Sequence, residues 1–248
     1  MGKLLAFEFR KLFRLKSFYI CTGITLLMGI LTLRAFSHGG AGYDGFVSLL
    51  KAVDNSSLTM LLGIWTAIFI CDDYTAGTIR NIVTRGYTRT AIFFSKLIVL
   101  CCGALIMLVL DWIVSCIAGE AMWGKPQTVL SIGFMKSLMA QLMLVIAYAC
   151  LCNAIASAVQ KTGVAVAICA VMPVAVFLLL SFIEITLANR GSSIGAMSLE
   201  QYWLNDMISA VSFPDAPAED LTRAFKASVC YIAATSVLGW FSIARKEY

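Results

Sequence analysis

Six stretches of the sequence are apolar over most of their length, and polar segments separate them. A helix that crosses the hydrocarbon core of a bilayer needs about 20 mostly apolar residues. The runs are continuous and lack the alternation over segments of about ten residues that marks a transmembrane β-strand. We therefore predict six membrane-spanning helices, at residues 17–33, 57–71, 91–117, 137–159, 163–187 and 225–243.

Two further segments have the mixed pattern of a helix that lies along a membrane surface. Residues 1–16 alternate leucine and phenylalanine with lysine and arginine. We expect an interfacial elbow helix there, which either flanks the first span or also touches a cytoplasmic partner. In the long outer loop 188–222, apolar residues recur at helical spacing over 199–212. We expect an outer amphipathic helix there, and we expect the five tryptophans mainly near span ends, as interfacial anchors.

Lysine and arginine collect on one side of the six spans. With the N-terminus in the cytoplasm, 12 of the 19 lysine and arginine residues fall in cytoplasmic segments, as the positive-inside rule requires. The composition agrees, because 60% of the 248 residues are hydrophobic and only 13% are charged, against about 25% charged in an average soluble domain. We predict an all-α membrane protein with both termini inside and one transmembrane domain over 1–248. The net charge of +5 follows from this topology, so we expect no nucleic-acid partner.

Catalytic and metal-binding chemistry is hard to build from this sequence. His38 is the only histidine, so a multi-histidine metal centre is excluded, and its glycine-rich surroundings favour a loop. The nine cysteines lie in or at the ends of apolar segments and lack the C-x-x-C spacing, which is typical of buried structural thiols. The sequence also lacks a GxxxxGK[ST] loop for ATP. We expect a non-catalytic protein that binds no metal and no cofactor of its own.

The most informative segment, residues 72–90, directly follows the second span. Two aspartates are followed by Tyr-Thr-Ala-Gly-Thr and then by arginines at spaced positions. We expect a cytoplasmic helical turn in which Asp72 or Asp73 caps the start of the helix and Gly77 permits a close backbone approach. Ile82 and its apolar neighbours are expected to form a stripe, while the arginines stay in water.

This segment resembles the second-span and coupling-helix signature of ABC-2-type export permeases. Members often show an acidic pair, an aromatic residue, Gly-Thr, a basic residue, and later an arginine and a lysine that opens the third span. Here Asp stands where members often carry Glu, and the matching residues are Asp72, Asp73, Tyr74, Gly77, Thr78, Arg80, Arg89 and Lys96. The resemblance implies that this segment forms the interface with an ATPase. The implied interface residues are Asp72, Asp73, Tyr74, Gly77, Thr78, Arg80, Arg85 and Arg89. The close match covers residues 69–97, and the rest of the chain agrees in its spans and amphipathic segments.

The resemblance also implies partners and a cargo. Cytoplasmic ABC ATPase subunits, which hold ATP and Mg, would bind the coupling segment and change the packing of two permease halves. Six spans make up one half, so a second copy or a related permease is implied, with membrane lipids around it. The implied cargo is amphipathic, a peptide, an antibiotic or a lipid-like molecule that is moved out of the bacterial plasma membrane or the cell. Antibiotic resistance, or immunity to a membrane-active peptide, fits a permease of this size.

Two acidic residues within the predicted spans leave a second function open. Asp111 lies in the third span and Glu184 near the outer end of the fifth, and ionisable groups inside a membrane are functional candidates. They would either line the path of a cationic substrate, in an ATP-independent secondary transporter or channel, or reach the outer headgroups. A membrane-embedded enzyme and a non-transporting assembly or sensor subunit are further alternatives.

Overall fold

The computed structural model describes residues 2–38, 45–54, 57–123, 132–189, 199–213 and 216–244. Most of these residues are helical. In chain order the elements are α1 (Gly2–Arg14), α2 (Lys16–His38), α3 (Gly45–Asp54), α4 (Ser57–Thr75), α5 (Thr78–Thr84), α6 (Arg89–Trp123), α7 (Ile132–Val159), α8 (Thr162–Asn189), η2 (Leu199–Tyr202), α9 (Leu204–Ala210) and α10 (Ala218–Ala244).

Six helices of the described chain are long and apolar enough to cross a membrane. These candidate spans are Lys16–Ala35, Ser57–Thr75, Arg89–Trp123, Ile132–Val159, Thr162–Leu187 and Ala218–Ser242. Each overlaps one of the six apolar runs in the sequence, so the prediction of an all-α protein with six spans is confirmed. The amphipathic N-terminal segment also forms a helix, α1, which ends one residue before α2 begins.

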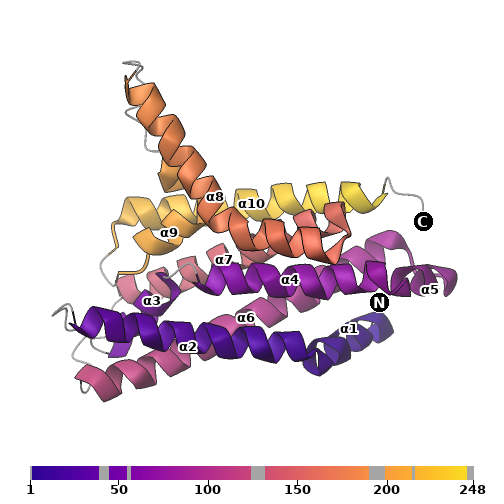
Figure 1. The fold of residues 1–248 in the computed structure, drawn as a ribbon, viewed down its shortest axis with the longest axis horizontal. Coiled ribbons are helices and arrows are strands. Elements are labelled where there is room, and N and C mark those ends of the chain that lie inside the picture. Colours follow the sequence, from indigo (N-terminus) through magenta and orange to yellow (C-terminus); the bar gives the residue numbers. More distant parts are fainter. Residues whose placement is uncertain are drawn as a thin grey trace.

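α4 and α7 lie at the centre of the helix bundle (Figure 1). α7 packs along α10, α4 packs on α8 and α7, and α6 packs on α2 and the short helix α3. Their buried side chains form one large core, in which Trp65 and Tyr148 are among the largest fully buried residues. All nine cysteines are free and five of them are buried. α1 and α5 lie at one end of the bundle, called the α5 end here, and α3 and α9 lie at the other, the α9 end (Figure 1).

α8 leaves the bundle partway along its length (Figure 1). Its buried side chains are Ala165, Cys169 and Pro173, all in the first half of the helix. A proline inside a helix removes a backbone hydrogen bond and bends the helix axis, so we attribute the change of direction to Pro173. The second half of α8 exposes large apolar side chains, among them Phe177 and Phe182.

α4 and α8 approach each other closely at Gly63. A Cβ atom placed on this glycine would lie 2.9 Å from the backbone oxygen of Cys169, so an added methyl group must push the two helices apart. Overpacking of this kind costs about 1–3 kcal/mol, and we expect Gly63→Ala to lower the unfolding temperature measured in mild detergent. Gly163→Ala is the matched control, because a Cβ atom there meets nothing within 4 Å. Equal stability of the two variants would contradict the close approach.

The amphipathic helix predicted over 199–212 is divided in the structure. The 3-10 helix η2 covers Leu199–Tyr202, α9 covers Leu204–Ala210, and Trp203 in an extended conformation separates them. Three side chains of α9 are buried, so this segment packs into the bundle and does not merely rest on a membrane surface. Pro217 directly precedes α10, and its fixed φ suits the start of a helix.

Candidate functional site

A short helix, α5, connects the second and third spans. It covers Thr78–Thr84, and a glycine with positive φ lies on each side, Gly77 at 66° and Gly86 at 85°. Glycine adopts this left-handed conformation without the steric cost that a Cβ atom brings. The two glycines therefore allow the chain to turn sharply before and after α5. The helical turn expected within residues 72–90 is present, and its cytoplasmic location stays a prediction.

A small apolar cluster holds α5 against the bundle. It consists of Leu4 of α1, Ile82 of α5 and Ile92 of α6, with Tyr87 packed against them. Ile79 of α5 is buried as well, which confirms the expected apolar stripe at these two α5 positions. α5 therefore cannot move without disturbing its contacts with α1 and α6.

Four charged side chains form a second, buried cluster where α1, α4 and α6 meet. These are Glu8, Lys11, Asp73 and Lys96, referred to as the charge cluster. Lys11 Nζ lies 2.6 Å from Asp73 Oδ1, and Lys96 Nζ contacts Asp73 Oδ2 and lies 3.3 Å from Glu8 Oε1. The two acids and Lys96 are at most 4% exposed. Two positive and two negative charges balance each other, as charges withdrawn from water require.

Phe69 of α4 borders the charge cluster. Its ring centroid lies 4.7 Å from Lys11 Nζ and 5.7 Å from Lys96 Nζ, within the range of a cation–π interaction. Lys11 Nζ also donates a 3.0 Å hydrogen bond to the Phe69 carbonyl oxygen. Burial lowers the pKa of Lys11, and the negative charges of Glu8 and Asp72 oppose that shift. The charge cluster thus connects α1 to α4 and α6. Each charged group in it needs the opposite charges of the others to remain stable away from water.

The two aspartates of the predicted coupling interface have different surroundings. Asp73 is buried in the charge cluster, whereas Asp72 is exposed. Both belong to α4, which ends at Thr75, and α5 begins only at Thr78. The expectation that one of them caps α5 is therefore wrong. The turn at Gly77 separates the two helices, and Asp73 pairs with the half-buried Lys11 and the buried Lys96 instead.

The other predicted interface residues are spread over the α5 end. Tyr74 is half-buried and packs against the main core. Thr78 and the exposed Arg85 line an open groove of about 400 Å³ between α1 and α5. Arg89 is half-buried and begins α6. Arg80 lies within α5, and its side chain is outside the described part of the structure.

Glu8 and Lys11 were absent from the predicted interface. The sequence suggests that the basic groups of α1 stay near the membrane surface, but Lys11 pairs with Asp73 instead. One signal does exist, because Leu4, Glu8 and Leu12 recur every fourth residue and all three are buried. Residues at this spacing share one helix face. An acid on the apolar face of α1 needs a buried cation opposite it, and the structure supplies Lys96.

The two intramembrane carboxylates lie against different helices. Asp111 of α6 is 1% exposed, and a Cβ atom on Gly29 of α2 would lie 3.0 Å from its Oδ1. Within the described residues, neither carboxylate oxygen of Asp111 has a hydrogen-bond partner. Glu184 of α8 is half-buried and accepts a 2.8 Å hydrogen bond from the backbone N–H of Glu200 in η2. The structure therefore does not pair them at one site, and their role in a substrate path stays a prediction.

The six candidate spans define the class of the protein, a polytopic all-α membrane protein. The model of a family described as ABC-2 family transporter protein matches residues 4–183. This match covers well over half of the chain, so the protein belongs to the ABC-2 transporter family, in agreement with the resemblance seen in residues 69–97. The search for similar curated proteins finds no match. The protein is a multi-pass membrane protein, and the bacterial plasma membrane is the typical setting of its family.

Proposed function

We propose that the chain is the membrane subunit of an ATP-driven exporter, and that its α5 end faces the cytoplasm. The distribution of lysine and arginine supports this orientation, and membership of the ABC-2 family supports a partnership with ABC ATPase subunits. In this proposal ATP and Mg bind to the partner. The chain itself is non-catalytic and forms the translocation path.

The way in which α5 joins the bundle carries this proposal. Thr78 and Arg85 of α5 line the open groove. Ile79 and Ile82 are buried and fix α5 to the bundle, and Ile82 forms part of the groove wall. α1, which contacts α5 through Leu4, also supplies Glu8 and Lys11 to the charge cluster. A force applied to α5 would therefore reach α1, α4 and α6 together. Small helix shifts of this kind are a common means of switching a packed protein between two states.

A second permease copy, or a related permease, completes the translocation path in this proposal. The support comes from the second half of α8, which turns away from the bundle and exposes apolar side chains such as Phe177, Leu178 and Phe182. Helices in a membrane associate through van der Waals packing, and the projecting half of α8 is open to such packing by a second permease. Two chains that meet there would enclose a path between their bundles.

We propose an amphipathic cargo, namely a peptide, an antibiotic or a lipid-like molecule, moved out of the cell or the membrane. The resemblance of residues 69–97 to export permeases supports outward transport, and the apolar surface of α8 suits an amphipathic molecule better than a small ion. Immunity to a membrane-active peptide, or resistance to an antibiotic, would then be the biological outcome.

A specific observation favours one second candidate, an ATP-independent transporter or channel. Asp111 is almost completely buried and its carboxylate oxygens have no hydrogen-bond partner among the described residues. A buried acid in that state is a candidate for binding a proton or a cationic group. Glu184, which sequence reasoning paired with it, is already engaged by η2.

The test is purification of the tagged chain from its native membrane in mild detergent, with identification of co-purifying proteins and an assay of ATP turnover. We expect a stoichiometric partner with a nucleotide-binding loop. Arg85→Glu reverses an exposed charge on the groove and should lower the amount of co-purified ATPase about fivefold to tenfold. Asp73 is unsuitable for this purpose, because its replacement would also disturb the buried charge cluster.

Lys136→Glu is the matched control for Arg85→Glu. Lys136 is also exposed, but it lies in the first turns of α7, at the α9 end, and its reversal should leave the co-purified ATPase unchanged. Equal effects of the two reversals would exclude the groove as the docking surface. A chain that purifies without any ATPase would instead favour the second candidate, and Asp111→Asn would then be the variant to assay for transport.

A further inference from the structure

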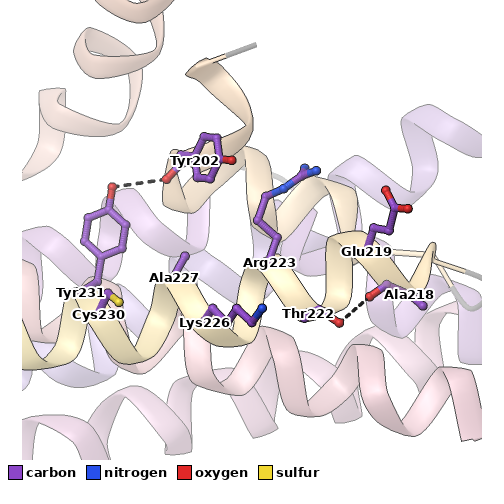
Figure 2. Close-up of a pocket in the computed structure, with 9 residues that line it drawn as sticks. All are labelled: Tyr202, Ala218, Glu219, Thr222, Arg223, Lys226, Ala227, Cys230 and Tyr231. Atoms are coloured by element: carbon purple, nitrogen blue, oxygen red, sulfur yellow. Dashed lines mark hydrogen bonds between the residues drawn. The ribbon is translucent and has the colours of Figure 1, made fainter. Parts of the chain in front are cut away.

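An open pocket lies at the α9 end of the bundle, beside the first turns of α10 (Figure 2). Its volume is about 830 Å³, within the range of pockets that bind small molecules. α10 forms one wall, and Tyr202 of η2 lies across from it. The Tyr231 hydroxyl donates a 3.3 Å hydrogen bond to the Tyr202 carbonyl oxygen, which holds η2 against α10. This pocket is separate from the groove beside α5, which lies at the opposite end of the bundle.

Polar and apolar groups follow one another along the α10 wall of the pocket. Glu219, Arg223 and Lys226 occupy the first turns, and Cys230 and Tyr231 follow (Figure 2). From Glu219 to Tyr231 the helix rises about 18 Å at 1.5 Å per residue. Because α10 is a candidate membrane span, the charged end of the pocket lies at the bilayer boundary and the other end lies toward the hydrocarbon. The pocket therefore has the polarity of an amphiphile that lies parallel to α10.

The charges of the pocket suit a ligand that carries both signs. Arg223 Nη1 lies 3.0 Å from Asp220 Oδ1, so much of the Arg223 charge is already balanced, and its guanidinium lies 5.7 Å from the centroid of the Tyr202 ring. Lys226 and Glu219 are exposed on the same wall. A ligand with a phosphate and an ammonium group a few bonds apart would find a partner for each charge, Lys226 for the phosphate and Glu219 for the ammonium group.

We propose that this pocket binds a zwitterionic phospholipid with a primary ammonium headgroup, of the phosphatidylethanolamine class. The phosphate pairs with Lys226, the ammonium group donates to Glu219, and an acyl chain runs along Cys230 and Tyr231. Charge-assisted hydrogen bonds of this kind are stronger than neutral ones. Phosphatidylglycerol has no ammonium group for Glu219, and phosphatidylcholine has one without N–H donors. The proposal rests on the membrane location of α10 and not on transport.

The test follows the Cys230 thiol of the full chain in lipid nanodiscs. Discs of phosphatidylcholine alone are compared with discs that contain equal parts of phosphatidylcholine and phosphatidylethanolamine, and peptide mass spectrometry measures the rate of maleimide modification. Phosphatidylcholine exchanges freely along α10, whereas a phosphatidylethanolamine held by its headgroup stays over Cys230. We therefore expect modification by a membrane-permeant maleimide to be about fivefold slower in the mixed discs. Glu219→Gln should abolish this difference. Glu120→Gln, which changes an exposed acid near the end of α6, should preserve it.

Native mass spectrometry of the same discs counts the phosphatidylethanolamine that each chain retains, independently of the thiol. We expect Lys226→Gln and Glu219→Gln to lower this count and Glu120→Gln to leave it unchanged. Equal modification rates together with equal lipid retention would overturn the proposal, as would stronger protection by phosphatidylglycerol. Protection of Cys230 by glycerophosphoethanolamine added to phosphatidylcholine discs would also overturn it, because the ligand would then be a soluble headgroup and not a membrane lipid.

Discussion

Replacement of Lys96 by methionine is expected to lower the free energy of unfolding by about 3–5 kcal/mol. Methionine is similar in length to lysine but uncharged, so Glu8 and Asp73 stay buried with only Lys11 to balance them. Both acids are at most 4% exposed, and water cannot replace the missing ammonium group without opening the bundle. Thermal unfolding in mild detergent, and the yield of monodisperse protein, measure the loss.

Two further variants separate charge balance from other effects of the Lys96 substitution. Lys161→Met removes an exposed lysine between α7 and α8 and should change the free energy of unfolding by at most about 0.5 kcal/mol. Lys96→Met combined with Glu8→Gln leaves Lys11 and Asp73 as one balanced pair, and we expect it to recover part of the loss. If Lys96→Met proved as stable as Lys161→Met, the charge cluster would not stabilise this end of the protein.

The membrane spans could be predicted because a long apolar run has few other uses in a protein. The ends of the spans were harder to place. The apolar run at 57–71 is short for a bilayer, and α4 continues past it to Thr75 through the two aspartates. The apolar run at 225–243 covers only part of α10, which begins at Ala218. Pro217 and the acids Glu219 and Asp220 indicate this earlier start, because proline and acids suit the first turn of a helix. Hydropathy detects the apolar part of a helix and not its polar ends.

The charge cluster could be predicted only in part. Asp73 and Lys96 stand in a recognisable pattern, and both belong to it. Their partners, Glu8 and Lys11, come from the N-terminal helix, and the meeting depends on how α1 lies against α4 and α6. Periodicity indicates that α1 is a helix with an apolar face. Periodicity does not indicate which neighbouring helix that face contacts. A buried acid whose partner is distant in the sequence therefore cannot be distinguished from an ordinary surface charge.

Trp65 shows the same limit for apolar packing. Tryptophan is enriched at membrane interfaces, and the sequence favours that location for most of the five tryptophans. Trp65 is instead fully buried, with its ring centroid 5.3 Å from that of Phe18 and 5.7 Å from that of Phe69. Gly103 of α6 makes room for the ring, since a Cβ atom there would lie 3.0 Å from Trp65 Cζ2. A glycine matched to a tryptophan on another helix leaves no local signal in the sequence.

Trp65→Ala is expected to lower the free energy of unfolding by about 3 kcal/mol. Side chains of a membrane protein leave one apolar environment for another on unfolding, so the cost is mainly the packing lost around the cavity and not transfer to water. Trp240→Ala is the matched control, because Trp240 is 41% exposed on α10. We expect that control to lose about 1 kcal/mol or less. Thermal unfolding of both variants in the same detergent measures the difference.

A double-mutant cycle tests whether Gly103 and Trp65 share one space. Gly103→Leu alone should be destabilising, because its side chain would overlap the Trp65 ring. In the Trp65→Ala background the same leucine enters the vacated volume. The double variant should therefore lose less free energy of unfolding than the two single variants lose together. Purely additive losses would contradict the contact. Because Phe69 lies next to Trp65 and also borders the charge cluster, we expect ATPase co-purification to fall with Trp65→Ala and to recover in the double variant.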